Sequence, residues 1–128
     1  MSCRFTELII DAEDPDGLAA FWQQVLGYEE RDRDEDAIEI GGPPGTGPTL
    51  VFLRVPEPKT VKNRLHIDVN ATDRDQAAEL ERLLALGARP VDVGQGDAVS
   101  WHVLADPEGN EFCLLARRVD AETAWPPA

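Results

Sequence analysis

The chain has 128 residues, of which 42% are hydrophobic and 29% are charged, as in an ordinary globular domain. Its 25 acidic residues outnumber its 12 basic residues and give a formal net charge of -13 at pH 7. Such a charge repels nucleic-acid phosphates and anionic membrane surfaces, so we expect neither as a partner. A signal peptide, a run of roughly 20 apolar residues and a disulfide framework are all missing from the sequence, which predicts a cytoplasmic protein of one domain.

The first patterned segment is FTELIIDAEDPDGLAAFWQQVLGYE, in which a short apolar strand precedes a helix start. Asp14 is of the type that caps a helix N-terminus, and Pro15 suits the first helical position. Gly27 is the expected stop of this helix. Between the two ends, apolar residues recur at helical spacing and predict one buried stripe, made of Leu18, Phe21, Trp22, Val25 and Leu26.

A second segment, RLHIDVNATDRDQAAELERLLALGARP, repeats this pattern. Asp73 is the expected helix cap, 59 residues after Asp14, and Gly87 is the expected stop. The predicted apolar stripe of this helix consists of Ala77, Leu80 and Leu84. Because strand, cap and helix match at one offset, the chain reads as an internal repeat.

Three strand-like runs separated by turn residues follow each predicted helix, so each half reads β-α-β-β-β. A half of about 60 residues buries little apolar surface alone, which predicts an α+β fold with two tandem modules whose curved mixed sheets share a cavity. We expect module one at about 4–56, a linker at 57–62, module two at 63–117, and a tail at 118–128 that contains Trp125. The strand-like runs are Tyr28 to Arg33, Ala37 to Ile40, Thr49 to Val55, Arg89 to Val93, Ala98 to Leu104 and Glu111 to Ala116.

Alternation along the strand of the second segment predicts which side chains reach that cavity. Leu65, Ile67 and Val69 should lie under the helix, so His66 and Asp68 should point to the opposite face. Glu7 precedes His66 by the repeat offset of 59 residues and should therefore converge with it from the matching strand.

The chain closely resembles the vicinal oxygen chelate superfamily. The resemblance rests on the paired β-α-β-β-β pattern and on three stretches in chain order, DPDGLAAFWQQVLGYE, RVPEPKTVKNRLHIDV and VLADPEGNEFCLL. That superfamily contains glyoxalase I, extradiol dioxygenases, and fosfomycin and bleomycin resistance proteins, and the nearest branch is the glyoxalase-like domain proteins. The resemblance covers the chain to about Arg117 and implies a small-molecule ligand. A shared fold does not by itself fix the chemistry.

The resemblance also implies where a metal would bind. Metal-using members carry a ligand on the first strand of each module, matched here by Glu7 and His66, and a glutamate on the last strand. Cys113 stands at the position of that glutamate, and Glu111 lies two residues earlier on the same strand face. We therefore expect no cofactor and no tightly bound transition metal. A divalent metal, if one binds, would use His66, Glu7 and Cys113.

Three kinds of function remain open: a metal-free binding protein, a metal-free enzyme that uses acid–base groups, and a metal-dependent lyase, isomerase or extradiol-type dioxygenase. The missing glutamate favours the first two, with the metal-dependent enzyme as the alternative. Strand period alone leaves open whether Trp101 or His102 faces the cavity. A short chain of half-open sheets also predicts a homodimer. The candidate catalytic residues are His66, Glu7 and Asp68, and the candidate ligand-binding residues are Trp101, Phe52, Cys113 and Glu111.

Overall fold

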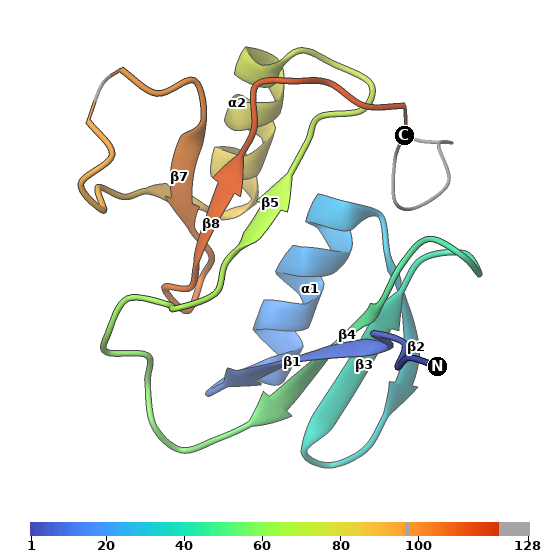
Figure 1. The fold of residues 1–128 in the computed structure, drawn as a ribbon. Helices are drawn as coiled ribbons and strands as arrows, with labels where there is room; N and C mark the ends of the chain where they lie inside the picture. The colour runs from blue at the N-terminus through green and yellow to red at the C-terminus, as the bar shows by residue number, and fades with distance from the viewer. Residues whose placement is uncertain (97, 121–128) are drawn as a thin grey trace. The chain divides into compact units, whose positions relative to one another are not determined.

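The computed structural model describes residues 1–96 and 98–120 and divides the chain into two compact units. The first unit is Met1–Pro58 and the second begins at Lys59, so the division falls inside the predicted linker, 57–62. Most of the predicted tail, with Trp125, lies outside the described residues. In the described part, each unit is one β-α-β-β-β module, as the sequence predicts (Figure 1). Neither helix of these modules is long and apolar enough to span a bilayer.

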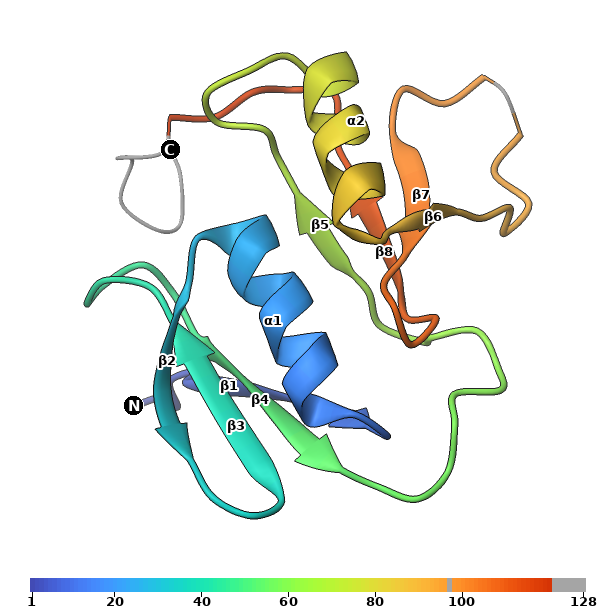
Figure 2. The same cartoon turned by 180° about the vertical axis from the view of Figure 1, so that it is seen from behind.

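The first unit is a four-stranded sheet with one helix on it (Figure 2). Its strands lie in the order β1-β4-β3-β2, with β1 parallel to β4 and the other neighbours antiparallel. The elements are β1 (Glu7–Ala12), α1 (Pro15–Leu26), β2 (Glu29–Arg33), β3 (Ala37–Gly41) and β4 (Thr49–Arg54).

Helix α1 begins and ends where the sequence predicts. The Asp14 carboxylate accepts a hydrogen bond from the backbone N–H of Gly17 at 3.2 Å, and Pro15 needs no partner at the first position. Gly27 adopts a left-handed conformation with φ 68°, which a glycine accepts without steric cost. The helix buries Leu18, Phe21 and Trp22 in a core shared with the inner face of the sheet, namely Ile38, Ile40, Leu50 and Phe52.

The second unit repeats this topology in the order β5-β8-β7-β6, with β5 parallel to β8. All four of its strands are shorter than predicted: β5 begins at Ile67, β6 has two residues, β7 begins at His102 rather than Ala98, and β8 ends at Leu114 rather than Ala116. The chain between β6 and β7 turns instead, because Gly94 and Gly96 take positive φ values and the Asp92 carboxylate accepts from the Gly94 N–H. The elements are β5 (Ile67–Val69), α2 (Gln76–Leu86), β6 (Arg89–Pro90), β7 (His102–Ala105) and β8 (Glu111–Leu114).

Helix α2 starts later than the repeat predicts, so Asp73 is the wrong cap. The Asp75 carboxylate accepts from the Ala78 N–H at 2.8 Å, whereas Asp73 forms an ion pair with Arg74 at 3.0 Å. Both aspartates precede a helical run, and local spacing alone does not distinguish them.

The predicted apolar stripe of α2 is also wrong in part. Leu80 is half-buried, but Ala77 is exposed and Leu84 is 37% exposed. The helix buries Leu83 completely, together with Glu79, whose carboxylate accepts two hydrogen bonds from the Arg82 guanidinium. Because the cap of α2 lies two residues later than predicted, a different set of its positions faces the core.

Leu65 is a further correction, because it is 80% exposed and precedes β5. Alternation places residues on sheet faces only inside a paired strand. Within β5, Ile67 and Val69 lie opposite Phe112 and Leu114 of β8, as expected for core-facing positions.

The turn DPEGN fixes the start of β8. The Asp106 side chain is fully buried and accepts hydrogen bonds from the backbone N–H groups of Glu108 and Asn110, both at 3.0 Å. Gly109 takes a φ of 90° in this turn, a conformation that side chains other than glycine rarely adopt. The next residues enter β8, so this turn sets the register of the strand that carries Cys113.

We expect Asp75→Ala to destabilise the protein by about 1 kcal/mol, because the N-terminal N–H groups of α2 lose their cap. Asp73→Ala removes a carboxylate two residues away and serves as the matched control, with little change expected for an exposed pair. Urea unfolding of both variants measures the difference. A larger loss for Asp73→Ala would restore the cap that the repeat predicts.

Candidate functional site

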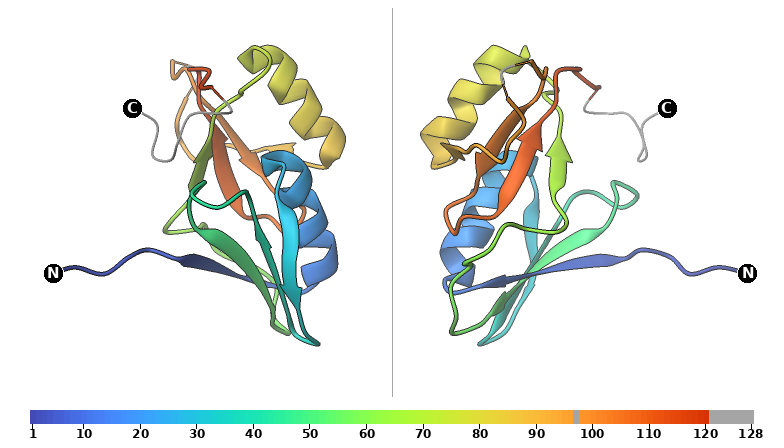
Figure 3. Two further views of the ribbon diagram at one scale, coloured as in Figure 1. Left: turned by 90° about the vertical axis from the view of Figure 1, so that its right-hand side faces the viewer. Right: turned by 60° about the vertical axis from the view of Figure 1, so that its left-hand side comes forward.

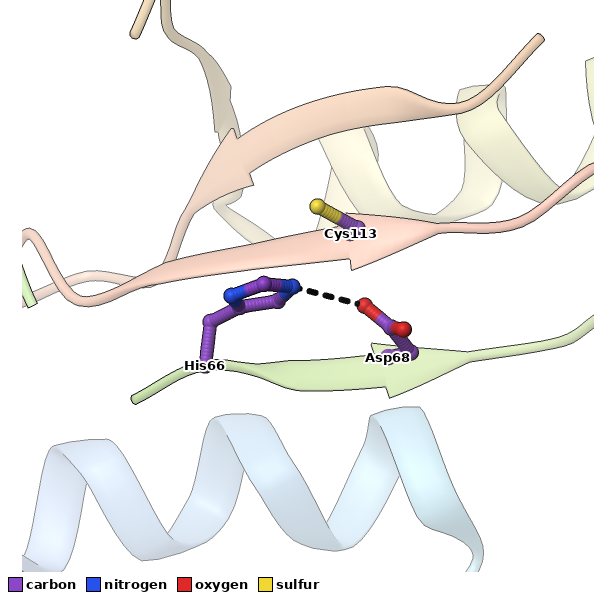
Figure 4. Close-up of side chains that lie close together, drawn as sticks. All are labelled: His66, Asp68 and Cys113. Atoms are coloured by element: carbon purple, nitrogen blue, oxygen red, sulfur yellow. Dashed lines mark ion pairs between the residues drawn. The ribbon is translucent and has the colours of Figure 1, made fainter. Parts of the chain in front are cut away.

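Strands β5 and β8 bring three polar side chains together on one face of the second sheet (Figure 4). Asp68 lies directly opposite Cys113 in the parallel register. His66 directly precedes β5, and its side chain lies beside that of Asp68 (Figure 4). His66 Nε2 is 3.0 Å from Asp68 Oδ1. One nitrogen of His66, one oxygen of Asp68 and the sulfur of Cys113 all lie within 4.8 Å of one another.

This cluster occupies the face of the second sheet opposite to its apolar core. Phe112 and Leu114 alternate with Glu111 and Cys113 along β8 and are fully buried on the other side. Helix α2 lies against that other side of the sheet (Figure 3). The alternation thus separates a packed face, which stabilises the module, from a face that carries polar groups.

The His66–Asp68 pair is suited to binding and to proton transfer. The two side chains are 49% and 46% exposed, so a ligand can reach them. A neutral imidazole that donates its Nε2 hydrogen to Asp68 presents Nδ1 as an acceptor. The carboxylate also fixes the orientation of the imidazole, as the partner of a general acid or base does.

Cys113 is a small buried group rather than a reactive thiol. Its exposed fraction is 7%, and this burial raises the pKa of the thiol. The negative charge of Asp68 raises the pKa further, while the positive charge of Lys62 acts in the opposite direction. The protonated thiol is a weak nucleophile.

Glu111 has two partners of its own and does not join the cluster. Its carboxylate accepts from the Lys59 ammonium at 2.7 Å and from the Asn63 backbone N–H at 3.2 Å. Burial acts to raise the pKa of Glu111, but these hydrogen bonds outweigh it and hold the pKa below its usual value. Glu111 therefore attaches the start of the second unit to β8, and its predicted role in ligand binding stays untested.

The predicted residues of the first unit lie on two faces of its sheet. Glu7 is exposed on the face opposite to the core-facing Leu8, and Leu53 of β4 shares that outer face. Phe52 is fully buried on the core face, so it does not share a face with Glu7. The convergence of Glu7 with His66 remains a prediction, as does a ligand-binding role for Phe52.

The register of β7 places His102 on one face of the sheet, but Trp101 precedes the strand, so which of the two faces the cavity stays a prediction. His102 pairs with Leu114 and so lies on the face of the packed core, whereas Val103 pairs with Cys113. Trp101 precedes the strand and is 40% exposed. His102 is thus the histidine on the opposite face from the cluster, and binding by Trp101 stays a prediction.

The contact of Asp68 with Cys113 was not anticipated, although both residues were singled out. The available signal was the parallel pairing of the first and last strands of a β-α-β-β-β module. Lys59 and Asn63 were missed entirely, because nothing in their spacing indicates a partner 52 or 48 residues away.

The donor chemistry tests which metals the cluster could hold. Mn(II), Mg(II) and Fe(II) prefer octahedral sets of oxygen and nitrogen donors, which one imidazole, one carboxylate and one thiol do not supply. The same three groups match a zinc site with three protein ligands and one open position. These three residues by themselves therefore do not make a hard-metal site, and a contribution from Glu7 stays a prediction.

Comparisons with known proteins agree with this topology. The sequence model described as a glyoxalase-like domain matches residues 7–115. No curated protein gives a significant sequence match.

Three solved structures with the same fold are 17–20% identical to this chain. A glyoxalase/bleomycin resistance protein/dioxygenase family enzyme from Burkholderia phytofirmans is 19% identical, with a TM-score of 0.67 over 88% of this chain and 97% of that one. A mutant of the fosfomycin resistance protein FosX from Listeria monocytogenes, complexed with Mn(II) and 1S,2S-dihydroxypropylphosphonic acid, is 17% identical, with a TM-score of 0.72 over 91% and 94%. A bleomycin-binding protein from Streptomyces verticillus, complexed with copper(II)-bleomycin, is 20% identical, with a TM-score of 0.58 over 91% and 98%.

We expect Glu111→Gln to cost about 1–3 kcal/mol of stability at pH 7, because Lys59 loses its counter-charge in a mostly buried contact. The lowered pKa means that the folded state favours the ionised carboxylate, so this stability is present above the ordinary carboxyl pKa. It is lost as the pH falls through the lowered pKa of Glu111. Urea unfolding from pH 7 to pH 3 should show the wild type and the variant converging.

Glu57→Gln is the control, since Glu57 is an exposed carboxylate of the predicted linker. Its stability should follow that of the wild type across the same pH range. A Glu111→Gln variant as stable as the wild type at pH 7 would show that the Lys59 contact contributes nothing.

Proposed function

Because this chain belongs to the glyoxalase-like domain family, we propose that it binds a small molecule at the face of the second sheet that carries His66, Asp68 and Cys113. The binding requires no hard divalent metal. The observation that carries this proposal is the half-exposed His66–Asp68 pair beside the sulfur of a buried cysteine.

The three groups offer different contacts to a ligand. His66 supplies a hydrogen-bond donor or acceptor whose orientation Asp68 holds, and Cys113 supplies a small, polarisable, neutral surface. A few polar groups in fixed positions are what small-molecule sites use to orient a ligand. Two structures of the same fold contain small-molecule ligands, 1S,2S-dihydroxypropylphosphonic acid in one and copper(II)-bleomycin in the other, which supports a small-molecule ligand here.

If a reaction occurs, His66 is the group that moves a proton. Asp68 would orient the imidazole, and Glu7 is the second candidate if the two modules bring it near the ligand. A metal-dependent lyase, isomerase or dioxygenase is the alternative function. His66 supports this alternative, since it occupies a ligand position of the metal-using members, whereas Cys113 in place of the glutamate counts against it.

The two histidines make the binding proposal directly testable by NMR. A small-molecule library that includes bleomycin and 1S,2S-dihydroxypropylphosphonic acid is screened against the full chain in a buffer with chelator. We expect a bound compound to shift the imidazole signals of His66 and to leave those of His102 unchanged, because His102 lies on the core-side face of the sheet.

Matched variants separate binding from folding. His66→Ala should weaken binding of the same compound at least tenfold while the melting temperature changes little, because the His66 side chain is half exposed. His102→Ala should bind as the wild type does. Compounds that shift His102, or that bind His66→Ala with unchanged affinity, would place the ligand elsewhere.

We also expect the protein to form a homodimer with two-fold symmetry, since small modules with open sheet edges gain burial by pairing. Static light scattering at micromolar concentrations should give twice the chain mass of 14.1 kDa. A mass of one chain throughout that range would contradict the dimer.

A further inference from the structure

We infer that His66, Asp68 and Cys113 form a binding site for a thiophilic divalent cation of the Zn(II) and Cd(II) class, contained within the second module. This goes beyond the proposed function, which needs no metal. It also differs from the ligand set implied by the resemblance, which takes donors from both modules and includes Glu7.

The backbone already places the three donors at nearly the required separation. Asp68 and Cys113 face each other across a parallel pair, and the ion pair with Asp68 holds His66, which directly precedes β5, beside them. Bonds of about 2.0–2.3 Å to a tetrahedral zinc separate neighbouring donors by roughly 3.5 Å. His66 Nε2 lies 3.0 Å from Asp68 Oδ1, and one donor atom of each of the three residues lies within 4.8 Å of the other two. Small changes in side-chain conformation would therefore bring all three donors to one zinc ion.

The nature of the donors decides which cation fits. A thiolate is a soft ligand and favours zinc, cadmium and similar ions over Mn(II) or Mg(II). Imidazole and carboxylate complete the three-ligand sets that leave a fourth position open for water or a ligand. The cation would also separate the charge of Asp68 from that of the thiolate, two negative groups that otherwise disfavour each other.

Within the described part of the second module, these three residues are the metal-ligating side chains that lie together. Glu111 shares the strand face of Cys113, but its carboxylate is held by Lys59 and Asn63. The Lys62 ammonium donates to the Asn63 carbonyl at 3.3 Å and lies close enough to influence Cys113. The positive charge of this lysine opposes a cation at the cluster.

Cd(II) titration of the chelator-treated full chain tests this inference, because a cadmium–thiolate bond gives a charge-transfer absorption in the near ultraviolet. We expect one Cd(II) per chain, with the band lost in Cys113→Ser and kept in Cys3→Ser, the control for the exposed thiol. Excess Mn(II) should not displace the cadmium. A band that persists in Cys113→Ser, the absence of a band in the folded wild type, or displacement by Mn(II) would each overturn the inference.

Two carboxylate variants distinguish this site from the one that spans both modules. Asp68→Asn should weaken Cd(II) binding, whereas Glu7→Gln should leave it unchanged. Loss of a residue that only hydrogen-bonds a metal ligand lowers metal affinity roughly 10–100-fold, so loss of the ligand Asp68 should cost at least as much. The reverse result would assign the metal to the set with Glu7. Asp68 and His66 are half exposed, so Asp68→Asn and His66→Gln keep the test valid even if Cys113→Ser does not fold. Unchanged affinity in both would exclude the site.

Binding of a small molecule is measured in chelator, so the two proposals fail independently. A ligand that binds without metal while Cd(II) gives no thiolate band would leave the proposed function standing and remove the cation site.

Discussion

The parallel pairing of β5 with β8 is the constraint on which the candidate site depends. One register, with Ile67 opposite Phe112 and Asp68 opposite Cys113, sends alternate residues to opposite faces of the second sheet. A shift of one residue would bury the polar set and expose the apolar one, so packing of the core also fixes the polar face. The buried Asp106 turn protects this register by determining where β8 begins.

Much of the fold follows from the sequence because its signals are local. The Asp14–Pro15 step, the helical stripe of α1 and the DPEGN turn each depend on residues close together in the chain. The second helix shows the limit of this approach, since Asp73 and Asp75 both suit a cap and only the chain's path from β5 decides between them. A two-residue difference turns a helix by about 200°, which is why the predicted stripe missed Leu83.

The site was predictable in part for the same reason. Alternation predicted that His66 and Asp68 lie together, and the resemblance drew attention to position 113, although the exposed Leu65 shows that alternation does not hold before β5. The pairing of Asp68 with Cys113 required the strand order, and the contact of Lys59 with Glu111 required the path of the linker. Whether Glu7 belongs to the same site depends on long-range geometry that no local pattern contains.

The Lys59–Glu111 contact has a consequence for the kind of ligand that can approach His66. Lys59 neutralises Glu111, which shares a face of the second sheet with Asp68, and Lys62 adds a positive charge nearby. Solvent ions screen the other acidic side chains beyond about 8–10 Å. An anionic group arriving at the imidazole would therefore meet one carboxylate and a neighbouring ammonium, and the acidity of the whole chain would not decide the sign of its ligand.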